Sequence, residues 1–256
     1  MIKKTPISKI LTLSFSFAKA NFKLRNEGSY LGILWYLLSP LMLFLIILFI
    51  KNEAFSHNEV PYYPVYLLIG ILMYHFFTQT IGASINIISS NSNFIKSIKI
   101  PTESLVIARV AQSVFSHIFE IIIILTTLLY FHVPLVGIVI YAPIFLFFCI
   151  FVLGISFIFS TLGVYFSDLN NLWVVASQFL FFITPIFYTP IMGSTLYLVN
   201  QFNPLYYFIT ASREMFLYNN LPDLNLSIII VGMSFATYFI GYFIFIKNKH
   251  NFAEYI

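Results

Sequence analysis

The sequence predicts an all-α integral membrane protein with six membrane-spanning helices. Three observations predict this class: a mean hydropathy of +0.91, a composition that is 60% hydrophobic and only 9% charged, and apolar runs long enough to cross a bilayer. Residues 28–50, for example, contain no charged side chain. A helix needs about 20 apolar residues to cross the hydrocarbon core. Backbone N–H and C=O groups inside lipid must also be paired internally, so each run is expected to be helical or shielded by protein.

The 256 residues are expected to form one transmembrane domain. Residues 1–27 would form a cytoplasmic amphipathic helix at the membrane interface, residues 28–246 the six-span bundle, and residues 247–256 a cytoplasmic tail. The expected spans are residues 31–50, 64–89, 105–131, 135–165, 172–186 and 226–246, with a break near Pro143 in the fourth. This leaves no room for a soluble domain of ordinary size, roughly 100 residues. Any motor or substrate-recognition domain must therefore belong to another chain.

The basic side chains predict the orientation of the bundle. Eleven Lys and Arg residues precede the first span, surround the loop between spans two and three, or follow the last span, whereas Lys51 and Arg213 fall on the opposite side. Cytoplasmic loops carry an excess of Lys and Arg, so both termini are expected to be cytoplasmic. The sequence pI of about 9.0 reflects this placement, and we expect no nucleic-acid partner.

The N-terminal segment has two interpretations. Its apolar stretch, followed by Ala18-Lys19-Ala20, is similar to a signal peptide with its cleavage site. Cleavage would place Lys23 and Arg25 outside, against the charge bias. The favoured interpretation is an amphipathic helix on the cytoplasmic surface. Its expected apolar face consists of Ile7, Leu11, Ala18 and Phe22, with Lys19 and Lys23 on another face.

The sequence gives no sign of an enzyme. It contains neither a G-x-x-x-x-G-K-[ST] phosphate loop nor an H-E-x-x-H zinc motif. We therefore expect no ATP hydrolysis, no cofactor and no metal in this chain. His117 and Glu120 are three residues apart in the third expected span. They are expected to hydrogen-bond to each other inside the bundle; binding of a proton or a metal is the alternative.

Residues 172–216 are too long for one crossing and are interrupted by prolines. Pro185, Pro190 and Pro204 lie in this stretch, which is charge-free until Arg213. We expect one span to about residue 186, followed by one or two short helices that dip back into the outer half of the membrane. Arg213, followed by Glu214, is a gate residue, a contact to an anionic substrate, or half of a charge pair that holds an irregular loop. Some of the 31 Phe and 17 Tyr residues could line a conduit, because sugar rings stack on aromatic faces.

The loop between spans two and three predicts a short amphipathic helix. Phe94, Ile95 and Ile98 fall on one helical face, Lys96 and Lys99 are displaced from it, and Pro101 would end the helix. Such a helix could dock into a cleft of a soluble partner or lie on the lipid headgroups.

Several segments, in order along nearly the whole chain, carry a family resemblance. They are residues 23–35 followed by Ser39-Pro40, then 63–70, 91–101, 164–168, 184–188, 203–204 and Arg213. These segments resemble the permease subunits of type-2 ABC exporters for polysaccharides, which export O-antigen, capsule or teichoic acid precursors. The resemblance implies a homodimer in the bacterial inner membrane, bound to two ATPase subunits that hold ATP and Mg. It also implies a lipid-linked polysaccharide as substrate and short outer gate helices between spans five and six.

The resemblance also implies roles for particular residues. The ATPase-coupling segment would comprise Asn91, Phe94, Ile95, Lys96, Ile98, Lys99 and Pro101. The interface helix and substrate entrance would comprise Lys23, Arg25, Trp35 and Tyr36. The outer gate would comprise Pro185, Tyr188, Pro190, Asn203, Pro204, Arg213 and Glu214. His117, Glu120 and Asp168 are the expected intramembrane polar residues, although Ser167 stands where the family usually has an arginine, which weakens the case for Asp168.

Two alternatives to this function can be distinguished by experiment. A permease of the same fold could export a drug or a small lipid, and its loss would leave the surface glycan intact. A membrane-embedded acyl or glycosyl transferase would turn over substrate as a purified single chain. It would also need more converging polar residues than His117 and Glu120 provide.

Overall fold

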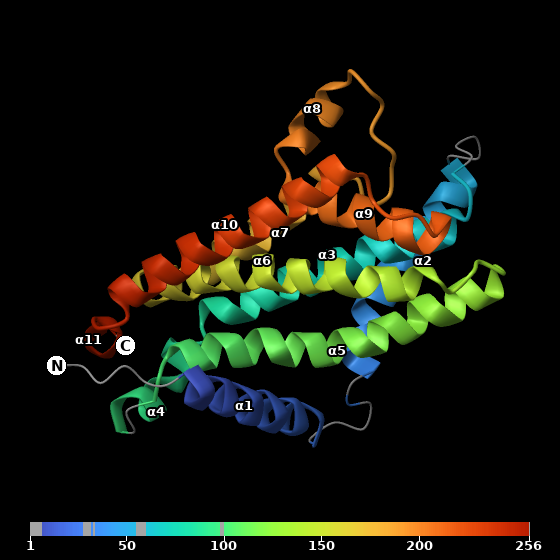
Figure 1. The fold of residues 1–256 in the computed structure, drawn as a ribbon. Coiled ribbons are helices and arrows are strands. Elements are labelled where there is room, and N and C mark those ends of the chain that lie inside the picture. The colour runs from blue at the N-terminus through green and yellow to red at the C-terminus, as the bar shows by residue number, and fades with distance from the viewer. Residues whose placement is uncertain (1–6, 28–31, 33, 55–59, 98–99, 256) are drawn as a thin grey trace.

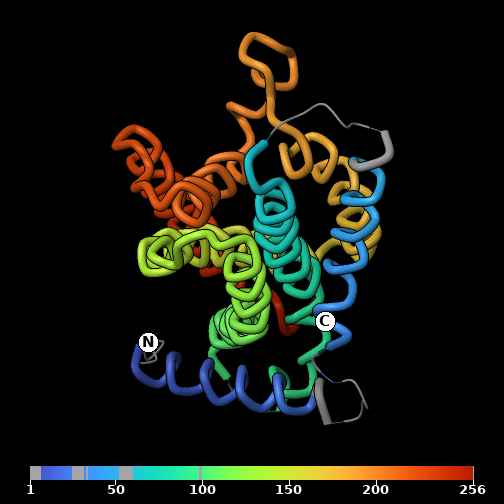
Figure 2. The backbone as a smooth tube through the Cα atoms, turned by 90° about the vertical axis from the view of Figure 1, so that its right-hand side faces the viewer, coloured from blue at the N-terminus to red at the C-terminus, as the bar shows by residue number. Residues whose placement is uncertain are grey.

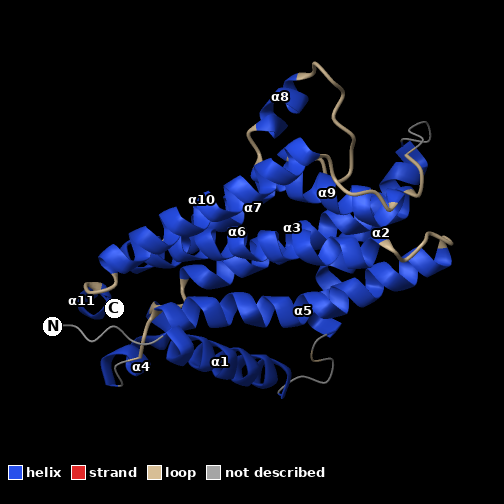
Figure 3. Ribbon diagram, in the orientation of Figure 1, coloured by secondary structure: helices blue, strands red, loops and turns tan. Residues whose placement is uncertain are grey.

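The computed structural model describes residues 7–27, 32, 34–54, 60–97 and 100–255, and this part of the chain is helical without strands (Figures 1 and 3). Its helices are α1 (Ile7–Glu27), α2 (Leu34–Ala54), α3 (Tyr63–Ile85), α4 (Ser92–Ser97), α5 (Glu103–Tyr130), α6 (Gly137–Tyr165), α7 (Leu169–Ile183), α8 (Thr195–Gln201), α9 (Pro204–Tyr218), α10 (Leu224–Asn248) and α11 (Phe252–Tyr255), with a 3-10 turn η1 at Ser89–Asn91. The predicted fold class is confirmed.

Five helices, α2, α3, α5, α6 and α10, are long and apolar enough to cross a membrane. The shorter apolar helix α7 has 15 residues, roughly 22 Å at 1.5 Å per residue, against a hydrocarbon core of about 30 Å. Together with the non-helical residues 184–188 it covers the fifth predicted span, residues 172–186. The α7–α8 loop that follows is the long tan segment in Figure 3.

The predicted break near Pro143 is wrong, because α6 is continuous from Gly137 to Tyr165. Proline removes the hydrogen bond to the carbonyl four residues earlier. For Pro143 that carbonyl belongs to Val139 in the first turn of α6, so little of the helix depends on it. Helix α7 begins at Leu169, three residues before the expected start of the fifth span at residue 172.

Helix α3 is the centre of the bundle. In the most apolar 18-residue stretch of α3, 83% of the residues are buried, against 11% in the corresponding stretch of α2. Figure 2 shows α3 between α5 and α6 on one side and α2 and α7 on the other, and it packs against all four. Side chains that must be shielded from lipid are therefore expected on α3 and on the helix faces that meet it.

Helices α6 and α10 approach closely through two glycines. A Cβ on Gly241 would lie 2.1 Å from the carbonyl oxygen of Gly154, and a Cβ on Gly154 would lie 2.4 Å from the backbone of Thr237. Small residues at such crossings let helix backbones pack together in a membrane, where no hydrophobic force between helices is available. The two glycines therefore set the distance between α6 and α10.

The predicted N-terminal helix is present as α1, and the residues of its predicted apolar face differ in burial. Ala18 and Ser14 are buried against α5, whereas Ile7 and Leu11 are 75% and 55% exposed. Phe22 does contact α5, with its ring 6.0 Å from that of Phe115. Small side chains allow α1 to approach α5 closely, while Ile7 and Leu11 remain exposed.

The described residues after α10, 249–255, fold back on the bundle. Helix α10 continues to Asn248, and the ring of the fully buried Phe252 in α11 lies 5.2 Å from that of Phe245. Lys249 Nζ lies 2.6 Å from Glu103 Oε1 at the start of α5. The segment predicted as a tail is thus packed against the end of the bundle that also carries α4 (Figure 1).

Candidate functional site

The most unusual part of the molecule is the non-helical backbone that follows α7. Each of the six consecutive carbonyl oxygens from Ile183 to Tyr188 accepts a hydrogen bond. The carbonyl of Ile183 accepts from Asn200 Nδ2 and the Tyr188 hydroxyl, and that of Thr184 accepts from Ile186 N. The carbonyls of Pro185 and Ile186 accept from Arg213 Nη1 and Nη2. Those of Phe187 and Tyr188 accept from the hydroxyls of Tyr63 and Tyr66, respectively. Irregular backbone is tolerated at membrane depth only when its polar groups are paired in this way. We call residues 183–188 the carbonyl segment.

Pro185 explains why the helix ends here. The residue before a proline is pushed out of the α region, and Thr184 accordingly has extended angles, φ −70° and ψ 135°. Thr184 Oγ1 accepts a hydrogen bond from Asn203 Nδ2 at 2.8 Å, and Asn203 Oδ1 caps α9 by accepting from Leu205 N. Pro204 takes the first position of α9, where a missing N–H costs nothing. The end of α7 and the start of α9 are therefore joined.

Arg213 is the main support of the carbonyl segment. Its side chain is 5% exposed, and it donates at 2.7 Å to Pro185 O and at 2.7 Å to Ile186 O. Its guanidinium carbon also lies 3.4 Å from the centre of the Tyr66 ring, a cation–π arrangement. A Cβ on Gly70 would come within 2.6 Å of Arg213 Nη2, so this glycine leaves room for the guanidinium.

The predicted charge pair between Arg213 and Glu214 is wrong. The two residues are adjacent on α9, and neighbours on a helix do not face each other. The Arg213 guanidinium turns to backbone carbonyls, and Glu214 is half-buried elsewhere. The interpretation that Arg213 holds an irregular loop agrees with this geometry. A direct contact with an anionic substrate does not, because the side chain is enclosed.

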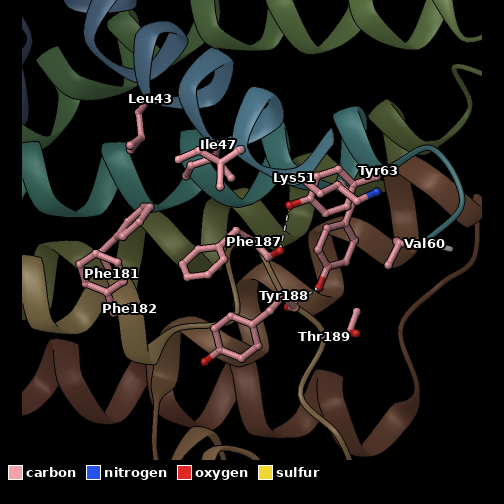
Figure 4. Close-up of a pocket in the computed structure, with 12 residues that line it drawn as sticks. Leu43, Ile47, Lys51, Val60, Tyr63, Phe181, Phe182, Phe187, Tyr188 and Thr189 are labelled. Atoms are coloured by element: carbon pink, nitrogen blue, oxygen red, sulfur yellow. Dashed lines mark hydrogen bonds between the residues drawn. The ribbon is translucent and has the colours of Figure 1, made fainter. Parts of the chain in front are cut away.

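An aromatic cavity of about 430 Å³ lies beside the carbonyl segment, between α2, α3 and α7 (Figure 4). Its apolar wall comes from Leu43 and Ile47 of α2 and from Phe181 of α7. Its polar end carries Lys51, whose Nζ lies 3.9 Å above the Tyr63 ring. Tyr188 lines the cavity, while Pro190 lies just beyond it in the stretch that leads to α8.

A buried hydrogen-bonded network connects α3, α5 and α6. Glu120 Oε2 lies 2.5 Å from His117 Nδ1, and Glu120 Oε1 lies 2.7 Å from His75 Nδ1. On the other side of the His117 ring, Nε2 lies 2.8 Å from the Tyr141 hydroxyl. The predicted hydrogen bond between His117 and Glu120 is confirmed. Among the described residues no cluster of metal ligands is found.

Sequence reasoning missed His75 and Tyr141, the two members contributed by other helices. His75 is the one histidine in the apolar run of α3. An ionisable group inside the membrane needs a partner, so this residue could have been identified from the sequence. Asp168, grouped with His117 and Glu120 from the sequence, is exposed at the start of α7. The prediction that Asp168 lies within the membrane together with His117 and Glu120 is therefore corrected. Asp168 lies in the connection between α6 and α7, at the end of a helix.

The segment between α3 and α5 contains, as α4, the helix predicted from residues 91–101. Helix α4 ends at Ser97, while Ile98 and Lys99 lie outside the described residues. Phe94 is 48% exposed and Lys96 is exposed. Ile95, predicted on the same face as Phe94, instead packs inward against the cluster around Phe252, because adjacent residues on a helix point in different directions.

The remaining residues of this segment and of the predicted entrance are spread out. Asn91 Nδ2 donates to Ile87 O at 2.8 Å within the turn before α4, and Pro101 is half-buried before α5. Lys23 is exposed on α1, and the side chain of Arg25 lies outside the described part of the chain. Trp35 is 58% exposed on α2, whereas the ring of its neighbour Tyr36 lies 4.6 Å from that of His75.

This arrangement is that of a multi-pass helical membrane protein whose sequence carries no phosphate loop. The chain belongs to the ABC-2 type transporter family, whose profile matches residues 12–217. It is also similar to proteins named O-antigen export system permease protein RfbA. One from Myxococcus xanthus is 24% identical over 94% of both chains, and two from Klebsiella pneumoniae are 28% and 27% identical over 91% of both chains. The predicted relationship to ABC permeases is confirmed, and members of this family are transport subunits.

Proposed function

We propose that this chain is the channel subunit of an ATP-driven exporter that moves a lipid-linked polysaccharide from the cytoplasm across the bacterial inner membrane. Two copies would form the channel, and two copies of a separate ATPase would supply the work. The observation that carries this proposal is the similarity, over more than nine tenths of each chain, to the proteins named as O-antigen export permeases. The identity of 24–28% leaves the glycan itself open.

The unequal packing of the helices supports a channel between two copies. Helix α2 has an exposed apolar face that includes Leu45 and Phe49, and α7 has one that includes Val175 and Phe179. Within α7 no residue is fully buried. Helices that pack weakly against their own bundle are suited to meet a second copy and to move apart. The proposed pathway therefore runs between α2 and α7 of the two protomers.

The aromatic cavity supports a sugar polymer as the substrate. Phe187 and Tyr188 line this cavity at the edge of the proposed pathway, and sugar rings can stack on aromatic faces. Their positions depend on the carbonyl segment, which Arg213 holds in place. In this proposal α8 and α9 are the outer gate helices, and the end of the bundle with α4 faces the cytoplasm.

Inactivating the gene in its host tests the proposal directly. We expect the surface polysaccharide to disappear while its lipid-linked form accumulates inside the cell, and we expect both changes to be reversed by the intact gene. An unchanged surface glycan combined with new sensitivity to a drug would contradict the proposal and favour a drug permease of the same fold.

Exposed Phe94 on α4 is the proposed anchor for the ATPase. Burying an aromatic anchor at an interface is worth about 2 kcal/mol, so Phe94→Ala should weaken ATPase binding about 30-fold. Binding would be measured by titrating the purified ATPase into permease reconstituted in nanodiscs. Phe202→Ala is the matched control, because Phe202 is 90% exposed next to α8, far from α4. Unchanged affinity for Phe94→Ala, or an equal loss for Phe202→Ala, would contradict the docking assignment.

A further inference from the structure

The polar contacts in the buried network around Glu120 need more hydrogen atoms than its residues supply in their usual ionisation states. It contains four polar contacts: His75 Nδ1 to Glu120 Oε1, His117 Nδ1 to Glu120 Oε2, His117 Nε2 to the Tyr141 hydroxyl, and the Tyr141 hydroxyl to Met73 Sδ at 3.1 Å. Each hydrogen bond needs one hydrogen between its two atoms. An ionised Glu120, two neutral imidazoles and one tyrosine hydroxyl supply only three.

The direction of the chain of bonds is set at its sulfur end. The Tyr141 hydroxyl donates to Met73 Sδ at 3.1 Å, and a thioether can only accept. In this arrangement the Tyr141 oxygen accepts from His117 Nε2–H. The remaining hydrogen lies between His117 Nδ1 and Glu120 Oε2. Either His117 is an imidazolium beside a carboxylate, or Glu120 is a carboxylic acid that donates to a neutral His117.

We propose that this network is an intramembrane proton-binding site, which holds one proton shared between Glu120 and His117 and is electrically neutral as a result. Both arrangements carry the same total charge, so the proposal does not depend on which of the two atoms holds the proton. The site is built by three helices, with His75 from α3, His117 and Glu120 from α5, and Tyr141 from α6.

The surroundings support a neutral site. Glu120 and His117 are fully buried, and a net charge inside the bundle would cost several kcal/mol. Among the described residues the charged partners of Glu120 are the two histidines alone. The other elements packed around the site contribute Tyr36 of α2, whose ring faces His75, Cys149 farther along α6, and the apolar Phe216 of α9, whose ring lies 4.6 Å from that of Tyr141.

The proton and the packing of the bundle are linked. Without the proton, the site would keep one net negative charge between α3, α5 and α6, and one of its four contacts would lose its hydrogen. The packed arrangement of these helices therefore favours the bound proton, and the bound proton favours the packed arrangement.

The chain contains only five histidines, so the protonation state can be read directly. The test uses full-length permease with ¹⁵N-labelled histidine in lipid, studied by solid-state NMR near neutral pH, with infrared spectroscopy of the carboxyl groups on the same sample. We expect either a His117 ring with both nitrogens protonated or a carboxylic acid band from Glu120. If His75 and His117 each have one unprotonated ring nitrogen and Glu120 is ionised, the proposal is overturned.

A variant assigns these signals. In Glu120→Gln the amide can accept from His75 and donate to His117, so all four contacts persist without an extra proton. The imidazolium signal or the acid band should disappear in this variant and persist in Glu254→Gln, which removes an exposed carboxylate outside the network. Persistence of the signal in Glu120→Gln would also overturn the proposal. The wild-type spectra decide the question even if this variant does not fold.

Discussion

Arg213→Leu is expected to abolish export and to destabilise the protein by about 3 kcal/mol. The substitution leaves the buried carbonyl oxygens of Pro185 and Ile186 without donors, and each such group costs about 1–3 kcal/mol. Released from α9, the carbonyl segment would no longer hold Phe187 and Tyr188 at the cavity. The measurement is the thermal unfolding temperature of the purified permease, together with the amount of polysaccharide at the cell surface.

Two controls separate the geometry of Arg213 from its charge. Arg213→Lys keeps the charge but not the planar fork that reaches two carbonyls at once, so an intermediate loss of stability is expected. Glu214→Gln changes the neighbouring charge and touches none of the bonds to the carbonyl segment, so little change is expected. If Arg213→Leu unfolds at the wild-type temperature, or if Glu214→Gln is equally damaging, the assigned role of Arg213 is wrong.

Gly241→Val is expected to break the packing of α6 against α10. Its Cβ would lie 2.1 Å from the carbonyl oxygen of Gly154, and no rotamer change can relieve a clash with a helix backbone. Overpacking typically costs 1–3 kcal/mol, and this site is expected at about 3 kcal/mol because both partners are backbone. The amount of folded protein extracted in mild detergent, measured by size-exclusion chromatography, should fall sharply.

Gly232→Val provides the matched control on the same helix. A Cβ on Gly232 meets no atom within 4 Å beyond the neighbouring backbone of its own helix, and both substitutions change the helix propensity of α10 in the same way. The control should be recovered in wild-type amounts. Equal loss in both variants would show that α10 itself, rather than its crossing with α6, is sensitive to a β-branched residue.

The spans could be predicted from the sequence, because long runs without charge have few alternatives in a bilayer. The buried face of α1 could not. In a soluble protein the large apolar residues mark the core, but in a membrane Ile7 and Leu11 can face lipid while Ser14 and Ala18 face α5. Hydrophobic periodicity therefore does not tell the protein side of a membrane helix from its lipid side.

The candidate site was predictable only in outline. Pro185 and Pro204 indicated irregular backbone after α7, and the need for hydrogen-bond partners followed from the membrane. The donors could not be predicted, because Tyr63 lies 124 residues before the carbonyl it binds and Arg213 lies 28 residues after Pro185. The same holds for His75, which is 45 residues from Glu120. Pairings of this kind depend on how the helices pack, which composition and spacing do not determine.

Reconstitution in liposomes tests the central claim, that this chain is a channel driven by a separate ATPase. The permease and its ATPase together should move a lipid-linked polysaccharide across the bilayer only when ATP is present, while the permease alone should neither hydrolyse ATP nor move the substrate. ATP hydrolysis or substrate conversion by the purified permease alone would contradict the account.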